Sequence, residues 1–279
     1  MKTRCGGKNL LRTFKKLIDI DDKKLKSQTF LIAQKSFFNY ALGFSKKESK
    51  ELTRSLFKRI KKTKSLKKER NYLVNLVKPR LSLFVVKWTK KRAIRDFKIV
   101  KKWLRGTDIL NIKAGRGHLG LKIRDDLGKN VIMIDEHNIE LFLRECLKKN
   151  KKFDTVLISG ELHHLRHLGK LLKEISKITK KRLIIFEPRI FFLKNSIGIS
   201  EKDWLELNLF SEWLFDTIKF KENKINPNNG YNQINYQKLK KLFSLVNFKL
   251  EHEEYIIVEP SEVIIHHHWL FILKKQNEK

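Results

Sequence analysis

Short apolar runs alternate with segments of helical periodicity from residue 106 to the end of the chain, and this alternation constrains the fold most. Repeated strand and helix units build sheets of mostly parallel strands covered by helices. The last two apolar runs are joined by "EPSE", and so short a connection predicts an antiparallel hairpin. The pattern predicts strands at residues 109–112, 131–135, 153–159, 182–187, 248–258 and 263–273, and helices at residues 118–127, 139–148, 168–178 and 236–245.

The region before this alternation differs in kind. Apolar residues recur there at helical spacing, as in Leu52, Leu56 and Ile60, with breaks expected at Gly43 and Pro79. Residues 1–100 carry 30 Lys or Arg against 7 Asp or Glu, out of a net charge of +33 for the whole chain. We therefore predict a basic helical N-terminal region, residues 1–91, followed by an α/β domain, residues 92–279.

The basic excess favours anionic partners such as RNA, phosphorylated substrates or acidic lipid surfaces. Its alternative explanation is a general lysine bias, because 48 lysines stand against 15 arginines throughout the chain. Nucleic-acid binding through the basic N-terminal region thus stays open, as does a transit-peptide role for the first 18 residues. No run of about 18 apolar residues occurs, so no membrane span is expected.

Cysteine usage is sparse. Cys5 and Cys146 are too few and too far apart to indicate a disulfide framework or a thiolate metal site. A cytoplasmic location fits this composition. His266, His267 and His268 are consecutive, but in a strand the middle one points to the opposite face, so no metal site is expected.

The stretch "DILNIKAGRGHLG", residues 108–120, combines an apolar run with G-x-G-x-x-G at Gly115, Gly117 and Gly120. Such a turn lets a ligand approach the backbone and offers it the N–H groups at a helix start. The next predicted strand ends in Asp135, whose carboxylate can accept the hydroxyls of an adenosine ribose. Dehydrogenases and methyltransferases share these features. Gly120 falls within the predicted helix and is expected to be incidental.

The segment "FDTVLISGELHHLRHLGKLLKEISKITKKRLIIFEP", residues 153–188, resembles class I S-adenosylmethionine-dependent methyltransferases of the type 11 group. With its flanks, the resemblance covers residues 92–273. It implies a Rossmann-like class I sheet with a C-terminal antiparallel hairpin, S-adenosylmethionine as cofactor, and methyl transfer to an unidentified, possibly anionic acceptor.

The resemblance also implies roles for individual positions. The methionine part of the cofactor would be held by Asn111, Ala114, Gly115 and Gly117. Asp135 would bind the ribose and Glu136 would border the adenine, while Ser159 and Gly160 would border the sulfonium. His163 and His164 follow them, and either is a candidate catalytic base or a cap of the next helix.

The chain departs from the family pattern at two positions and in the length of one segment. Asn111 replaces an acid and Lys113 replaces the first glycine. Only 17 residues separate Asp135 from Phe153, enough for one helical crossover, so the third, edge strand is expected to be missing. These departures favour an alternative, a catalytically degenerate methyltransferase-like protein that binds RNA or a ribonucleoprotein. A nicotinamide enzyme is a third interpretation.

Two aromatic groups have open roles. Each group is expected either to pack in a core or to cover a ligand. The first group lies in the N-terminal region and comprises Phe30, Phe37, Phe38, Tyr40 and Phe44. The second group lies in an insert at residues 189–235 and comprises Trp204, Phe210, Trp213 and Phe215.

Overall fold

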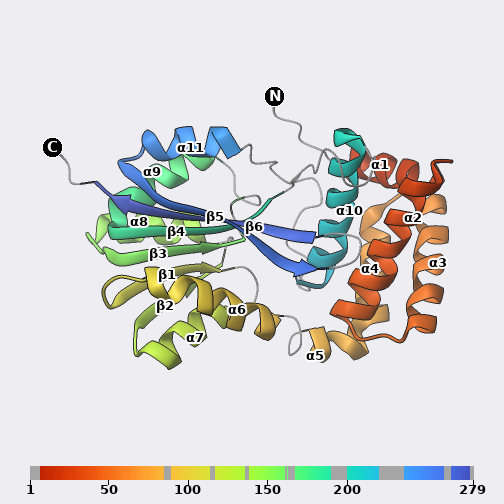
Figure 1. Cartoon of the computed structure of the whole chain (residues 1–279), viewed down its shortest axis with the longest axis horizontal. Helices are drawn as coiled ribbons and strands as arrows, with labels where there is room; N and C mark the ends of the chain where they lie inside the picture. Colours follow the sequence, from red (N-terminus) through yellow and green to blue (C-terminus); the bar gives the residue numbers. More distant parts are fainter. Residues whose placement is uncertain are drawn as a thin grey trace. The chain divides into compact units, whose positions relative to one another are not determined.

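The chain forms two compact units in a computed structural model (Figure 1). Unit 1 contains residues 1–89, 190–231 and 259–266, and unit 2 contains residues 90–189, 232–258 and 267–279. The structure describes residues 7–84, 89–113, 117–135, 138–160, 162, 167–189, 200–219, 236–260 and 265–276.

The described residues of unit 1 form helices and their connections, apart from residues 259–260 and 265–266, which are strand. Its elements are α1 (Gly7–Asp19), α2 (Lys23–Leu31), the π-helix η1 (Ile32–Ala41), α3 (Lys46–Lys62), α4 (Leu66–Val77), η2 (Lys78–Arg80), α5 (Leu81–Leu83) and α10 (Glu201–Lys219). The chain breaks at both predicted positions: Gly43 has a positive φ of 69°, and Pro79 lies in η2. Ser45 and Glu48 form a capping box at the start of α3, which satisfies two N–H groups there.

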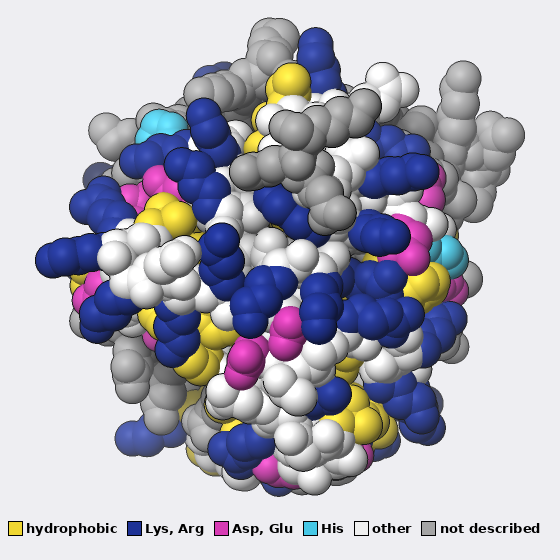
Figure 2. All heavy atoms as spheres, turned by 90° about the vertical axis from the view of Figure 1, so that its left-hand side faces the viewer, with side chains coloured by type: hydrophobic (Ala, Val, Ile, Leu, Met, Phe, Trp, Pro, Cys, Tyr) yellow, Lys and Arg dark blue, Asp and Glu magenta, His cyan; other side chains and the backbone are white. Residues whose placement is uncertain are grey.

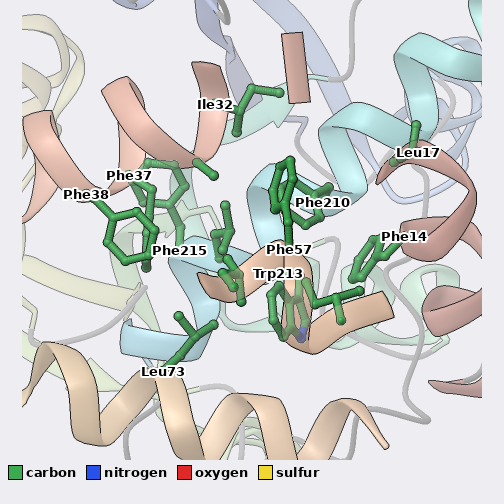
Figure 3. Close-up of a cluster of buried hydrophobic side chains, with 14 of the residues drawn as sticks. Phe14, Leu17, Ile32, Phe37, Phe38, Phe57, Leu73, Phe210, Trp213 and Phe215 are labelled. Atoms are coloured by element: carbon green, nitrogen blue, oxygen red, sulfur yellow. The ribbon is translucent and has the colours of Figure 1, made fainter. Parts of the chain in front are cut away.

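Aromatic side chains from both ends of unit 1 meet in its core (Figure 3). Phe14 of α1 packs edge-on against Phe210 of α10 at 5.2 Å, and Phe37 of η1 packs against Phe215 of α10 at 5.6 Å. Such pairs add specific geometry to the burial of large apolar surfaces. Helix α10 therefore completes the core of the N-terminal helices.

This packing shows that most residues of the two aromatic groups pack in a core. Phe37, Phe38, Phe210, Trp213 and Phe215 are buried core residues. Phe30 and Phe44 are partly buried against the same cluster, whereas Tyr40 is 57% exposed. The side chain of Trp204 lies outside the described residues.

Unit 2 contains a six-stranded sheet in the order β2-β1-β3-β4-β6-β5. Strands β1 to β4 pair in parallel and β6 pairs antiparallel with β4. The strands are β1 (Asp108–Lys113), β2 (Asn130–Ile134), β3 (Phe153–Ser159), β4 (Thr179–Arg189), β5 (Phe248–Pro260) and β6 (Ile265–Lys275). The helices are α6 (Lys90–Val100), η4 (Lys101–Trp103), α7 (His118–Leu127), α8 (Ile139–Lys148), α9 (Leu168–Ile178) and α11 (Tyr236–Ser244).

This sheet confirms the predicted fold class. Strands β5 and β6 are neighbours joined by four residues, a connection that only an antiparallel pair can make. Helix α8 is the one regular element between β2 and β3 in the described residues, and β2 forms the sheet edge. Unit 2 thus has the predicted Rossmann-like sheet with a C-terminal antiparallel pair, and no strand lies beyond β2 in the described residues.

Alternate residues of the central strands face two helical layers, which lie on opposite faces of the sheet in Figure 1. Leu110 and Ile112 of β1 pack with the layer of α8, α9 and α11, whereas Ile109 packs with the layer of α6 and α7. This alternation follows from the two-residue repeat of a strand. Within the described ranges, no helix is both long and apolar enough to cross a membrane.

The amino-terminal end of β3 is fastened to the segment before β1 by Asp154, which is 7% exposed. Its carboxylate accepts hydrogen bonds from the backbone N–H groups of Thr107 at 3.0 Å and Asp108 at 3.2 Å, and pairs with Lys181 at 3.1 Å. Burial alone would raise the pKa of Asp154, but these donors outweigh it and lower the pKa.

This lowered pKa predicts that Asp154 contributes to stability in an acid-sensitive way. The contribution is present above the ordinary aspartate pKa of about 4 and is lost as the pH falls through the lower folded pKa. We expect Asp154→Asn to lower the free energy of unfolding at pH 6, with a smaller difference from wild type at pH 3. Urea unfolding at both pH values measures this. Asp125→Asn, which changes an exposed α7 carboxylate, is the control, and a difference independent of pH would contradict the assignment.

Candidate functional site

The strand order creates a topological switch point at the carboxyl ends of the parallel strands. From β1 the chain crosses to β2 on one side, and from β3 it crosses to β4 on the other side. The crossovers therefore diverge between β1 and β3, and a crevice forms outside such a switch point in open α/β sheets. The ends of β1 and β3 are adjacent there, because Lys113 lies in register with Ser159.

The turn after β1 leads into α7 through Gly117. This residue has φ 70° and ψ 20°, a left-handed conformation that glycine adopts without strain, and it precedes the first residue of α7. The first N–H groups of a helix lack partners within the helix and favour polar or anionic ligand atoms. The predicted strand and helix are therefore present, with a left-handed glycine immediately before the helix.

Asn111 lies in the middle of β1, and its side chain is 1% exposed. Neither atom of its amide group, Oδ1 or Nδ2, has a hydrogen-bond partner within the described part of the chain. A buried amide without partners costs about 1 to 3 kcal/mol. Asn111 therefore lowers stability unless something in the working protein satisfies it.

Gly120 in α7 makes room for this amide. A Cβ atom at Gly120 would lie 2.6 Å from Nδ2 of Asn111 and 2.7 Å from the sulfur of Met133 in β2. The expectation that Gly120 is incidental is therefore wrong: it lets α7 approach β1 and β2 closely. The spacing G-x-G-x-x-G contained this signal, since its third glycine serves helix–strand packing in dinucleotide folds.

Asp135 follows β2 directly and is partly exposed. Its Oδ1 atom accepts hydrogen bonds from the backbone N–H of Asn138 at 3.3 Å and from Nδ2 of Asn138 at 2.9 Å. Asn138 caps α8, so the start of that helix orients the carboxylate. The carboxylate lies at the end of the strand next to β1, as the sequence predicts.

The end of β3 is held against β4. The N–H of Gly160, which has φ 68°, donates to the carbonyl of Phe186 at 2.6 Å, and the N–H of Leu162 donates to Glu187 at 3.2 Å. Glu187 is 3% exposed and ends the apolar part of β4. The sequence pattern does not identify Glu187 as a positioning residue, because its partner, the N–H of Leu162, follows a different strand, β3.

The structure thus describes five of the predicted cofactor-binding residues, three single positions and one pair. Asn111 lies in β1, Gly117 at the start of α7, Asp135 after β2, and Ser159 and Gly160 at the end of β3. Ala114, Gly115 and Glu136 and the predicted bases His163 and His164 lie outside the described residues, as do the side chains of Lys113 and His266, His267 and His268.

Other reactive groups do not gather at this edge. In the part of the chain that the structure describes, no three His, Cys, Asp or Glu side chains are grouped to hold a metal ion. Cys146 lies on the buried face of α8, and burial raises the pKa of its thiol. Among the described residues, the polar groups at the switch point are therefore amide, carboxylate, hydroxyl and backbone groups.

No protein-family model and no curated protein sequence matches the chain. Solved structures of several methyltransferases are similar to it. An S-adenosylmethionine-dependent methyltransferase from Archaeoglobus fulgidus shares 18% identity over 69% of this chain and 98% of its own, with a TM-score of 0.43. Magnesium protoporphyrin IX methyltransferase from Synechocystis was solved with bound S-adenosylhomocysteine. It shares 10% identity over 67% of this chain and 84% of its own, with a TM-score of 0.38. At this level of similarity, it is the strand order that identifies the fold.

Proposed function

We propose that unit 2 binds S-adenosylmethionine at the switch point and that the protein transfers its methyl group to an acceptor molecule. The observation that carries this proposal is the convergence of Gly117, Asp135 and Ser159 on the carboxyl ends of three adjacent strands. This convergence is what the resemblance to class I methyltransferases requires of the chain.

The residues present fit such a ligand by their chemistry. The left-handed Gly117 and the start of α7 offer backbone approach and N–H groups. Asp135 offers a carboxylate for two ribose hydroxyls. The unpartnered amide of Asn111, beside Gly120 of α7, offers one acceptor and two donors to the methionine part.

In the proposed reaction the cofactor, when bound, supplies a methyl group activated by a sulfonium. The chain's own contribution is to hold the acceptor nucleophile in line with that group, and positioning of this kind is worth about 7 to 11 kcal/mol. The bonds from Gly160 to β4 and from Leu162 to Glu187 fix the end of β3, where the nucleophile would lie. His163 or His164 would take the proton of an acceptor that still carries one.

Isothermal titration of the purified protein with S-adenosylmethionine and S-adenosylhomocysteine tests the binding step. We expect heat and saturation with both compounds, because the ribose and methionine contacts are common to the two. No heat with either compound at millimolar concentration would overturn the proposal and would leave a degenerate methyltransferase-like protein.

We predict that Asp135→Ala weakens S-adenosylhomocysteine binding about tenfold to hundredfold, since hydrogen bonds to a charged group contribute about 1.5 to 3 kcal/mol. Asn138→Ala is the matched control. It removes the side-chain amide that bonds Asp135 but keeps the carboxylate and the backbone N–H that also bonds it, so the affinity is expected to fall much less than in Asp135→Ala. Equal losses in the two variants would show that the start of α8, rather than the carboxylate, matters.

A further inference from the structure

Unit 2 has a second polar surface at the opposite end of its sheet, where β1, β3, β4 and β5 begin and β6 ends. We call it the amino-edge surface. Its exposed cations are Lys101, Lys102 and Arg105 before β1, Lys148 at the end of α8, Lys149, Lys151 and Lys152 between α8 and β3, Lys177 at the end of α9, Lys180 and Lys181 at the start of β4, Lys249 in β5 and Lys274 in β6. Figure 2 shows Lys and Arg side chains gathered on the corresponding face.

Contacts across the strands confirm that these residues share one surface. Lys180 lies 3.9 Å from the carboxylate of Asp108 at the start of β1. Lys274 of β6 lies in register with Arg182 of β4. The ring of Trp103, before β1, stacks on His252 of β5 at 4.7 Å. The surface therefore spans the sheet from β1 to β5, a width of about 20 Å at the usual spacing of strands.

The cations of the amino-edge surface exceed the acids available to them. Asp108 pairs with Lys180, Asp154 with Lys181, and Glu251 with the buried Arg182. The other cations of this surface have no ion pair within the described ranges. Further along β5, Glu253 pairs with Lys240 and Glu254 pairs with His252.

Lysine-rich composition alone does not explain this imbalance. On the outer faces of α7 and α9, some cations are paired with acids one turn away, as in Lys122 with Asp126 at 2.6 Å and Lys170 with Glu174 at 4.0 Å. Lys148 and Lys177 lie in the last turns of α8 and α9, where they offset the helix dipoles. Lys151, Lys152 and Lys249 lie outside helices and lack that explanation.

We propose that the amino-edge surface binds the phosphodiester backbone of a nucleic acid. Lysine ammonium groups act as point charges that neutralise phosphates without reading bases, so the binding is expected to be independent of sequence. A surface that binds membranes usually adds several apolar side chains that insert between lipids. Leu245, which is 70% exposed, is the one large apolar side chain strongly exposed near this edge among the described residues.

The test compares two triple variants of the full chain that carry the same change in charge. Lys101→Glu, Lys152→Glu and Lys249→Glu alter the amino-edge surface, and none of these side chains makes an ion pair in the described part of the protein. Lys47→Glu, Lys50→Glu and Lys58→Glu alter exposed positions of α3 in unit 1. Thermal melting checks that both variants remain folded.

Fluorescence anisotropy with a labelled 20-nucleotide RNA, its 20-base-pair duplex and the matching DNA duplex gives the affinities between 50 and 200 mM salt. We expect the amino-edge variant to bind at least about tenfold more weakly, and its salt slope to fall by about 2 to 3, since each phosphate contact contributes about 0.7 to 0.9. The α3 variant should lose less than about threefold. Binding of either nucleic acid supports the proposal, and the ratio of affinities shows which one is preferred.

Three results would overturn it. Equal losses in the two variants would indicate a response to overall charge alone, and a larger loss in the α3 variant would assign the binding to the N-terminal helices. A lack of nucleic-acid binding at 50 mM salt, with binding to vesicles of phosphatidylserine and phosphatidylcholine that the amino-edge changes weaken, would identify a membrane contact. The readout needs no cofactor, so it is independent of the proposed methyl transfer.

Discussion

Gly106→Ala is expected to lower the free energy of unfolding by about 3 kcal/mol or more. Gly106 has a φ of 69°, and an L-residue there costs about 1 to 2 kcal/mol. The added Cβ would also lie 2.2 Å from the carboxyl carbon of Asp154. The carboxylate would have to move away from the N–H groups of Thr107 and Asp108, which adds about 1 to 3 kcal/mol for donors left unsatisfied.

Gly128→Ala separates the two causes. Gly128 has a similar φ of 60°, but a Cβ there meets no atom within 4 Å. Urea unfolding should therefore show the backbone cost alone for Gly128→Ala, and a clearly larger loss for Gly106→Ala. In an Asp154→Gly background, most of the extra loss should vanish, because the Cβ and the carboxylate that a Cβ at Gly106 would meet are both gone. Equal losses for the two glycine variants would contradict the clash.

The contact between Gly106 and Asp154 shows where sequence analysis stops. The helices α7, α8 and α9 and the strand β3 begin and end at the predicted residues. Those boundaries depend on local signals, such as Gly128 at the end of α7 and apolar periodicity. The Asp154 contact joins a residue of β3 to one 48 positions earlier, just before β1, and no local pattern encodes it.

Helix α10 gives a second example of that limit. From the sequence, Phe210 and Phe215 fitted a ligand cover as well as a core. Periodicity shows that one face of a helix is buried, and it does not name the partner. The partner proved to be Phe14 and Phe37 of the N-terminal helices, far away in sequence.

At the candidate site, the sequence predicted positions better than contacts. The places of Gly117, Asp135 and Ser159 follow from the ends of strands, which apolar patterns mark well. The fit between Gly120 and Asn111 depends on the distance between a helix and a strand. Glu187, which holds the N–H of Leu162, depends on the pairing of β3 with β4.

Asn111→Leu is expected to raise the melting temperature and to abolish cofactor binding. Leucine matches the branched shape of asparagine and removes a buried amide that lacks partners, a gain of about 1 to 3 kcal/mol less the cost of two larger methyl groups beside Gly120. A net gain of about 1 kcal/mol corresponds to roughly 2 to 4 °C in a chain of this size. A residue that costs stability at a site is retained where function needs it.

Thr155→Val is the matched control for this substitution. Thr155 is also fully buried in the sheet, but its hydroxyl accepts from the N–H of Arg105 at 3.0 Å and donates to its carbonyl at 2.8 Å. Its loss should lower the melting temperature and leave the affinity for S-adenosylhomocysteine unchanged, which is the opposite of the result for Asn111→Leu. A destabilised Asn111→Leu would mean that the turn before α7 satisfies the amide in solution, whereas a stabilised variant with normal affinity would remove Asn111 from the proposed cofactor site.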